Sequence, residues 1–326
     1  MRQGENNVDK RKFWLIARKY ATLMILAIFL IAMAFLTDRF YTFNNLMNVG
    51  RQISMNAIIA IGMTLVIITG GIDLSVGGVC ALSCCMCARV LNNTQNIFLA
   101  IIVALAIGVA VGLFNGFIIS KTGIAPFIVT LSTVSIVNGL TLVITNSSPM
   151  PISNDAFKQI GQGALLNVPV PIYIMAVVAV IAAFVMSKTK FGRYIYAIGG
   201  NERSAIVAGI RVNMVKLIVY VASGFLAAFT AVIYTARLSS GVPSLGDGFE
   251  MDAITAAVIG GASLSGGQGS IPGTLIGAVI IGILNNALNL LNINSYYQDI
   301  VTGVVVLLAV LFDFFIQSRI SSKDRV

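Results

Sequence analysis

The residues of this chain that could do chemistry are few. The sequence contains no histidine, which excludes triads with a histidine base, proton relays through imidazole and most zinc sites. No glycine is followed directly by lysine, so the chain has no P-loop to bind a nucleotide phosphate. No paired catalytic groups come together in the sequence either. It therefore indicates no catalytic residue, no metal site and no cofactor bound by this chain itself.

The four cysteines are the next candidates. Cys80, Cys84, Cys85 and Cys87 lie within one apolar stretch, and their spacing matches no zinc pattern. A buried cysteine behaves as a small hydrophobic side chain. We therefore predict that the four pack inside the protein, with a redox or metal role as the alternative.

One short motif suggests an ATPase, and its surroundings exclude that interpretation. Residues 264–268 read LSGGQ, a sequence associated with ATP-binding-cassette (ABC) ATPases. There it works with a P-loop in a soluble domain, whereas here it lies between hydrophobic stretches and no P-loop precedes it. The chain cannot hydrolyse a nucleotide by this route.

The elements that must position all these residues are hydrophobic helices. Hydrophobic residues make up 57% of the 326 residues and charged residues 10%, and a helix needs about 20 apolar residues to cross a bilayer. The sequence predicts an all-α polytopic membrane protein with about ten spans, of which the eighth is too short to cross unbroken. The expected spans lie near residues 20–37, 52–69, 74–90, 97–120, 124–145, 169–187, 216–235, 251–262, 271–291 and 297–316.

The distribution of basic residues predicts the orientation. The net charge is +9, but the basic residues are scattered at loop ends rather than clustered with aromatics, which argues against a nucleic-acid partner. If the chain starts inside, sixteen of its 21 lysines and arginines fall inside. Both termini should then be cytoplasmic. We expect cytoplasmic tails at 1–19 and 317–326 around a transmembrane domain at 20–316.

The longest polar segment within the hydrophobic chain is residues 188–216, KTKFGRYIYAIGGNERSAIVAGIRVNMVK. We expect residues 199–200, two glycines, to break the chain and Asn201 to cap a short helix. Glu202 would lie in its first turn and Gly209 would end it. Such a helix is suited to contact with a cytoplasmic partner. The alternative is an ordinary basic loop that only sets the topology.

Charged side chains are expected only near span ends, at Asp73, Asp252, Asp299 and Asp313. Proton-driven proteins keep such charges at mid-membrane, so a proton-coupled carrier is disfavoured. A sodium-driven carrier that binds its ion through backbone carbonyls would leave no such mark.

Amides and hydroxyls inside the spans could line a path for a neutral, hydroxyl-rich solute. The alternative is that they bond across helices, as polar side chains do in membranes. The candidates for the path are Asp73, Asn115, Asn138, Asn285 and Asn286, with Asn56, Ser132, Ser135 and Asn289 as further polar positions.

Glycines indicate where backbones approach each other. Gly108, Gly112 and Gly116 form a GxxxGxxxG ridge, which predicts close helix packing. The segments 69–78 and 260–269 share the pattern GG-x-x-L-S, which suggests an internal duplication. Glycines of this kind let the backbone bend at membrane depth where it is buried against protein.

Three segments resemble, in order and spacing, the ribose-type sugar ABC importer permeases, which serve ribose, galactose, arabinose, xylose and allose. They are TGGIDLSVGG (69–78), FGRYIYAIGGNERSAIVAGI (191–210) and MDAITAAVIGGASLSGGQGSIPGTLIGA (251–278). The resemblance covers residues 45–313. It implies a homodimer in the bacterial inner membrane with the path at its axis. It also implies ten helices per protomer and a fold similar to the membrane subunit of the vitamin B12 importer.

The resemblance also implies the partners. A tandem ATPase subunit, which holds ATP and magnesium, would dock from the cytoplasm, and a sugar-loaded periplasmic binding protein from outside. The cargo would be a neutral monosaccharide, a pentose or a hexose. A sodium-driven secondary carrier or a passive channel for a small neutral solute are the alternatives. The implied ATPase-docking residues are Gly200, Asn201, Glu202, Arg203, Ala205 and Gly209.

Overall fold

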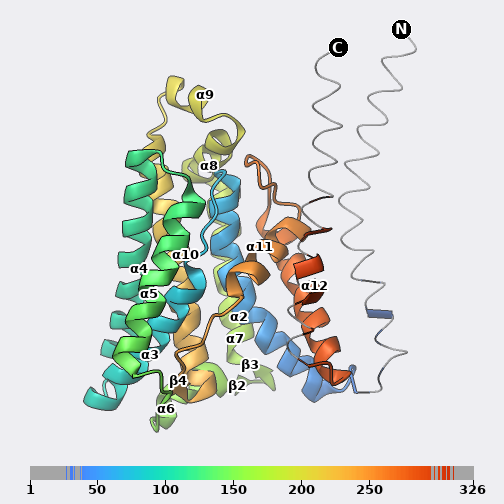
Figure 1. The fold of residues 1–326 in the computed structure, drawn as a ribbon. Coiled ribbons are helices and arrows are strands. Elements are labelled where there is room, and N and C mark those ends of the chain that lie inside the picture. Colours follow the sequence, from blue (N-terminus) through green and yellow to red (C-terminus); the bar gives the residue numbers. More distant parts are fainter. Residues whose placement is uncertain are drawn as a thin grey trace.

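The computed structural model describes residues 39–294 without interruption. Around them it also describes residues 27, 30, 31, 33, 37, 297, 300, 301, 303–305, 307, 308 and 311. The chain forms a helical bundle (Figure 1). The end that carries α9 (Glu202–Val207), at the top of Figure 1, is called the α9 end, and the opposite end, with α6 (Asp155–Gln162), the α6 end.

Within the described residues, seven helices are long and apolar enough to cross a membrane. Each corresponds to a span expected from the sequence, although α2 begins at Phe43 rather than near residue 52. From α2 to α10 successive spans alternate in direction, whereas α10 and α12 both start at the α9 end, because the short α11 leads back between them (Figure 1). The chain is thus a mostly helical, polytopic membrane protein. The seven are α2 (Phe43–Ile68), α3 (Val76–Thr94), α4 (Ile97–Thr122), α5 (Pro126–Thr145), α7 (Val170–Lys188), α10 (Val212–Leu238) and α12 (Ile271–Leu290).

The remaining elements are short. Helix α11 (Phe249–Ile259) has 11 residues and ends at Gly260, so the expected eighth span is too short to cross alone, as predicted. Two small antiparallel ladders lie at the α6 end, where Met150 pairs with Gly241 and Ala164 with Pro169. The other short elements are α8 (Lys190–Gly200), β1 (Met150–Pro151), β2 (Ala164–Leu165), β3 (Val168–Pro169) and β4 (Ser240–Gly241).

The expected first and last spans, 20–37 and 297–316, lie largely outside the described residues, and the tails 1–19 and 317–326 lie entirely outside them.

Local signals in the sequence explain where the helices begin. Side chains of residues just before a helix accept a hydrogen bond from a backbone N–H of its first turn, as Asn96 does from Leu99 and Asn154 from Phe157, each at 3.0 Å. Helices α5 and α12 carry a proline at their start, where the missing N–H costs nothing. Caps and prolines together set the helix boundaries that position the loops.

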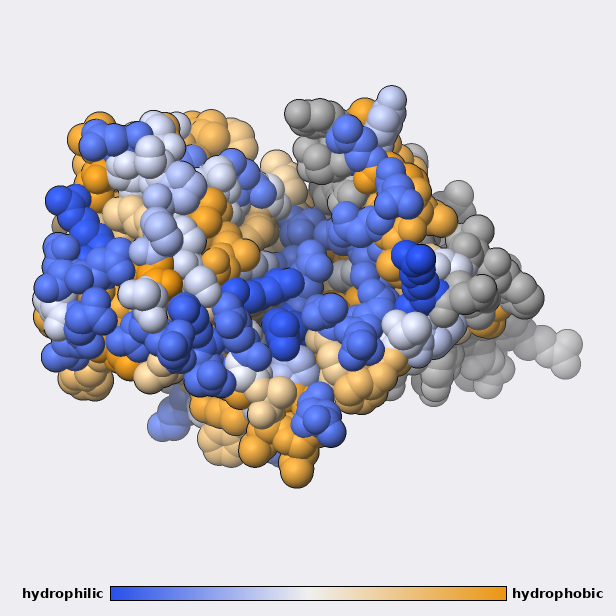
Figure 2. All heavy atoms as spheres, turned by 90° about the horizontal axis from the view of Figure 1, so that it is seen from below, coloured by the Kyte–Doolittle hydropathy of each residue, from blue (hydrophilic) through white to orange (hydrophobic). Residues whose placement is uncertain are grey.

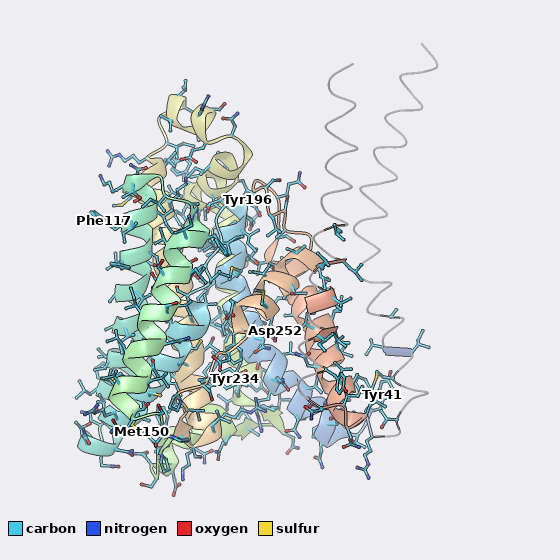
Figure 3. All side chains as sticks on the ribbon, viewed as in Figure 1. Tyr41, Phe117, Met150, Tyr196, Tyr234 and Asp252 are labelled. Carbon is cyan, nitrogen blue, oxygen red and sulfur yellow. The ribbon has the colours of Figure 1, made fainter. Side chains whose placement is uncertain are left out.

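Helix α2 occupies the centre of the bundle, and α4, α5 and α7 form much of its outer surface. Most of α2 is buried, whereas most of α4, α5 and α7 faces outward. Large apolar side chains such as Phe117, Val143 and Phe184 are exposed there, and Phe117 projects from the left edge in Figure 3. Lipid tails match such a surface, so the exposed apolar residues fit a protein that sits in a bilayer.

The GxxxGxxxG ridge packs α4 against α10, as predicted. Gly108 lies against the backbone of Gly224, Gly112 against that of Tyr220, and Gly116 against that of Leu217. Because no side chain separates the two helices here, their main chains approach as closely as backbone atoms allow. This contact fixes α10, which leads directly from the α9 loop into the bundle.

Replacing Gly112 by alanine should destabilise the bundle. A Cβ atom there would lie 2.5 Å from the Tyr220 carbonyl oxygen and 2.7 Å from the Val221 Cα, so the helices would have to separate. Overpacking of this kind costs about 1–3 kcal/mol, and the midpoint of thermal unfolding in detergent should fall. Gly139→Ala in α5 is the matched control, since nothing lies within 4 Å of the added Cβ. Equal midpoints for the two variants would contradict this packing role.

Candidate functional site

The polar segment 188–216 forms two helices rather than the single short helix expected. Helix α8 starts after Thr189, whose hydroxyl accepts a hydrogen bond from the Gly192 N–H at 3.3 Å. Residues 199–200 do not break the chain: they form the last turn of α8, and the break falls at Asn201, whose backbone is extended with φ −163°. The expectation of a glycine break was therefore wrong by one residue, because both glycines keep helical geometry and Gly199 packs closely against the Ile68 carbonyl.

The predicted caps of α9 are confirmed. The Asn201 Oδ1 accepts from the Ser204 N–H at 2.9 Å, and Glu202 lies in the first turn. Gly209 ends the helix with φ +81°, a conformation that glycine adopts without strain. Its N–H donates to the Ile206 carbonyl at 2.9 Å. A helix of only six residues is thus held at both ends by local hydrogen bonds.

Helix α9 presents nearly all of its surface to solvent. Of the implied docking residues, Gly200, Asn201, Glu202, Arg203 and Gly209 are exposed, whereas Ala205 is buried and anchors the helix. Two apolar side chains that the sequence analysis did not single out, Ile206 and Val207, are 57% and 89% exposed. They give this short helix an apolar patch among polar neighbours.

An ion pair ties α9 to α10. Both carboxylate oxygens of Glu202 lie 2.8 Å from the Lys216 Nζ. The Glu202 side chain is 48% exposed and that of Lys216 19%, so the pair contributes about 1 kcal/mol at most. Sequence reasoning recognised the acid but not its partner, because the two residues are 14 positions apart and meet only after the chain turns.

Three glycine-rich segments meet directly beneath α9. The Gly267 N–H donates to the Ile68 carbonyl at 2.9 Å. Gly199 lies against the same carbonyl and against the Gly267 nitrogen, and a Cβ on Gly266 would lie 3.1 Å from the Gly70 nitrogen. We call Gly70, Gly199, Gly266 and Gly267 the glycine junction. It joins the end of α2, the end of α8 and the loop 260–269 through main-chain atoms.

A side chain reinforces the glycine junction. The Tyr196 hydroxyl on α8 donates to the Gly269 carbonyl at 2.8 Å, and Figure 3 shows Tyr196 where α8 meets the bundle. Burial raises the pKa of Tyr196 above its ordinary value, so the phenol remains a donor at neutral pH. Beside the junction lies a cavity of about 550 Å³. Its lining is Thr69, Gly70, Pro126, Ile198, Gly199, Gly200, Asn201, Glu202, Arg203, Lys216 and Ser265.

The LSGGQ sequence and the repeated GG-x-x-L-S pattern both belong to this region. LSGGQ lies in the loop between α11 and α12, with its two glycines in the junction. The two GG-x-x-L-S segments also share a local turn. In one, the Ser75 N–H donates to Asp73 Oδ1 at 3.0 Å, and in the other the Ser265 N–H donates to Ser263 Oγ at 3.3 Å. An internal duplication stays a prediction.

Asp73 stands at the centre of a closed hydrogen-bond network. Its side chain is 1% exposed. Oδ1 accepts from the Ser75 N–H and hydroxyl at 3.0 and 2.6 Å, and Oδ2 accepts from the Ser223 hydroxyl at 2.8 Å. The Asn115 amide donates to Ser75 Oγ at 2.9 Å and accepts from Thr133 at 2.6 Å. The structure thus brings Asp73 and Asn115 together. Both take part in hydrogen bonds between helices, which was the alternative to lining a solute path.

The other predicted path residues lie elsewhere. Asn286 on α12 forms a reciprocal amide pair with Asn45 on α2, at 3.0 and 3.1 Å. Asn138 is half-buried on α5 beside Gly78 of α3, and Asn285 is half-buried next to Asn286. The structure does not gather the five residues into one site, and their assignment to the path stays a prediction.

A second polar cluster was missed. Asp252 was expected near a span end and lies in the first turn of α11, inside the bundle (Figure 3), where its Oδ2 accepts from the Asn56 amide at 3.3 Å. Asn56 lies midway along α2 and accepts from the Tyr234 hydroxyl at 3.0 Å. This helix end lies inside the protein because α11 begins within the bundle. Sequence periodicity gives the length of a helix but not its depth.

The cysteine cluster is buried, as predicted. All four cysteines are free, and none is exposed. Cys80 donates to the Ala227 carbonyl at 3.1 Å and Cys84 to the Ser240 carbonyl at 3.7 Å. They therefore contribute to the contact of α3 with α10 and β4.

Comparisons with known proteins agree with this architecture. Residues 45–310 match the family model described as "Branched-chain amino acid transport system / permease component". The chain is 47% identical to the ribose import permease protein of Escherichia coli K12 over 306 residues, 93% of this chain and 95% of the relative. It is 46% identical to the ribose import permease protein of Bacillus subtilis, over 91% of this chain and 93% of the relative. It is 38% identical to the D-allose transport system permease protein of Escherichia coli K12 over 92% of both. No solved structure matches the chain.

Replacing Ser223 by alanine should lower the stability of the protein, because one oxygen of the buried Asp73 carboxylate would lose its donor. An unsatisfied buried acceptor costs about 1–3 kcal/mol, measurable as a lower midpoint of thermal unfolding in detergent. Ser187→Ala is the control, since that exposed hydroxyl bonds only to the Ala183 carbonyl of its own helix. A Ser223→Ala variant as stable as Ser187→Ala would contradict the role of the network.

Gly199 and Gly200 offer a matched pair for the glycine junction. A Cβ on Gly199 would collide with the Ile68 carbonyl, whereas nothing lies within 4 Å of one on Gly200. Gly199→Ala should therefore displace α8 and make the loop 188–216 more sensitive to a protease, while Gly200→Ala should not. Limited proteolysis of the two purified variants measures this directly. Equal cleavage rates would show that the junction does not hold α8.

Proposed function

Because the chain belongs to the family of branched-chain-type transport permease components, we propose that it is the membrane permease subunit of an ABC importer for a neutral monosaccharide. The observation that carries the proposal is similarity over nearly the full length to permeases named for ribose, allose and arabinose. Those names favour neither a sodium-driven carrier nor a passive channel. The cargo is a pentose or a hexose.

The energy for transport comes from a separate ATPase. The chain lacks the P-loop that would bind a nucleotide phosphate, so ATP and magnesium are bound by a partner subunit, which we propose to be a tandem two-domain ATPase. It docks on α9 through Gly200, Asn201, Glu202, Arg203, Ala205 and Gly209. The exposure of Ile206 and Val207 supports this assignment, because apolar side chains in water at the end of a membrane protein suit a protein partner.

Movement of the ATPase reaches the path through the chain itself. Helix α9 continues through α8 into α7 and directly into α10, and the glycine junction links α8 to the end of α2. Closure of the ATPase on ATP would shift α9 and these helix ends together. The permease then alternates between two states that nucleotide on one side and the loaded binding protein on the other both bias.

The orientation follows from the charges. Lys121, Arg203, Arg211 and the other basic residues of the segment 188–216 lie at the α9 end, which we place in the cytoplasm together with both termini. The transmembrane permease domain occupies residues 20–316 in a bacterial inner membrane, with ten helices similar to those of the vitamin B12 importer. A second copy completes the path, and a periplasmic sugar-binding protein docks at the α6 end.

For the path itself the sequence candidates remain a proposal: Asp73, Asn115, Asn138, Asn285 and Asn286.

Replacing Val207 by aspartate should prevent the ATPase subunit from binding to this chain. A tagged parent chain, purified in mild detergent from its own organism, should bring an ATPase subunit with it. A carboxylate in the centre of the apolar patch would need to be desolvated at the interface, and the yield of ATPase should fall about tenfold or more. Replacing Glu202 and Arg203 together by alanine should likewise prevent assembly or uncouple hydrolysis from uptake.

Leu166→Asp is the matched control. Leu166 is 86% exposed at the opposite end of the molecule, against 89% for Val207, and its substitution should leave the ATPase bound. If Val207→Asp and Leu166→Asp retain the ATPase equally, or if the Glu202/Arg203 double variant imports sugar at the parent rate, α9 is not the docking site.

A further inference from the structure

Three helices bring polar side chains together inside the bundle, away from the glycine junction and from the network around Asp73. Asn56 comes from α2, Tyr234 from α10 and Asp252 from α11. The Tyr234 hydroxyl donates to Asn56 Oδ1 at 3.0 Å, and the Asn56 amide donates to Asp252 Oδ2 at 3.3 Å. The Phe249 ring lies 5.2 Å from that of Tyr234 at 31°. We call Asn56, Tyr234, Phe249 and Asp252 the α11 cluster.

The α11 cluster differs from the network around Asp73 in its access to the surroundings. Asp73 is sealed, with a short donor on each oxygen and 1% exposure. Asn56, Phe249 and Asp252 are half-buried, whereas Tyr234 beside them is buried, at 7% exposure. A carboxylate inside a membrane protein is costly to bury and faces either a partner or a water-filled cavity. The closed network suits a structural role, whereas the open cluster suits contact with a solute.

The backbone around the α11 cluster has the form expected of a transport site. Helix α11 has 11 residues, about half of what a bilayer-spanning helix needs. It starts within the bundle after a turn in which Gly246 and Gly248 have φ +93° and +83°. Substrate sites of transporters are commonly built at such discontinuous helices.

The α6 end gives access from outside. Seen from that end, the surface is hollowed near its middle, and hydrophilic side chains line the hollow (Figure 2). On α10, Arg237 lies one helical turn beyond Tyr234 toward this end, and Arg51 of α2 lies close enough to Arg237 for their charges to interact. Polar groups therefore continue from the α6 end toward the α11 cluster.

The chemistry of the cluster matches a sugar. A carboxylate accepts two hydroxyl hydrogens, an amide both donates and accepts, and a phenol does either. Two aromatic rings add an apolar surface beside these polar groups, which is the usual composition of a small-molecule site. A set of this kind satisfies neighbouring hydroxyls of a neutral solute.

We propose that Asn56, Tyr234 and Asp252, with the ring of Phe249, form the site at which a neutral monosaccharide contacts this subunit on its way through the membrane. The site rests on the proposed function and adds to it a location and three recognising side chains. Asn56 is one of the further polar positions that the sequence suggested, whereas Tyr234 and Asp252 are not among the path residues suggested there.

Uptake of radiolabelled D-ribose, D-allose and L-arabinose by cells that express each variant tests the proposal. Tyr234→Phe keeps the ring and removes one hydroxyl, and Asp252→Asn keeps the shape and removes the charge. Each should lower uptake of the sugar that the parent carries by about two- to tenfold, the effect of one lost hydrogen bond. Thr230→Val is the matched control on the same helix, because its hydroxyl bonds to the Leu226 carbonyl one turn back, and uptake should be unchanged.

A labelling experiment separates contact with the path from a purely structural bond. Asn56→Cys should react with a hydrophilic, membrane-impermeant methanethiosulfonate added from outside, and the four native cysteines, all buried, give little background. The control Val180→Cys, at a position 69% exposed in the middle of the apolar helix α7, should not react. Reaction of Asn56→Cys should also block the remaining uptake.

The two proposals fail in different ways. If the tagged parent chain brings no ATPase with it, the proposed function fails. If the ATPase stays bound to Tyr234→Phe while uptake equals that of the parent, the assignment of the α11 cluster is overturned and the proposed function stands. The same holds if Asn56→Cys reacts no faster than Val180→Cys. If Asp252→Asn does not assemble with the ATPase, the results for Tyr234→Phe and Asn56→Cys decide whether the α11 cluster contacts the sugar.

Discussion

Main chain packed directly against main chain at the glycine junction is the contact on which the arrangement of this protein depends. Side chains at an interface can change rotamer and absorb a small displacement, but backbone atoms in contact cannot. Gly199 of α8 lies against the Ile68 carbonyl at the end of α2, and Gly267 donates to that same carbonyl at 2.9 Å. A shift of α8 and α9 must therefore also shift the central helix and the loop 260–269. The α9 end is thus mechanically continuous with the core, although α9 itself is almost entirely exposed.

Two interruptions between helices reach the glycine junction and would be displaced when α8 and α9 shift. The turn 69–75 separates α2 from α3, and the loop 260–269 separates α11 from α12. Both reach the glycine junction, and each leads to a polar group inside the bundle. Asp73 follows the first break and is closed off by serine donors, whereas Asp252 lies in the short helix that precedes the second break and is half-buried. The turn 69–75 is stabilised by the hydrogen bonds of the Asp73 carboxylate. The loop 260–269 follows the helix that carries Asp252 of the α11 cluster, which we propose contacts the solute.

Much of the framework was predictable from the sequence because its causes are local. Spans follow from runs of apolar residues, the start of α9 from the Asn201 cap and its end from Gly209, and close packing of α4 from glycines spaced by one helical turn, although its partner α10 does not follow from them. The segment with the docking residues was recognised for the same reason. What could not be predicted were the second helix α8, the pairing of Glu202 with Lys216 and the meeting of three glycine segments that are far apart in sequence.

The sequence by itself determined which stretches become membrane helices, which end is basic, and that no nucleotide-binding loop is present. These properties depend on residues within a few positions of one another. Only the tertiary structure decided which polar residues face one another, because Asn56 lies 178 positions from Tyr234 and 196 from Asp252 in the sequence. It also separated Asp73 from Asp252, two carboxylates that look alike in sequence. Their difference lies in burial, which is set by how the helices pack.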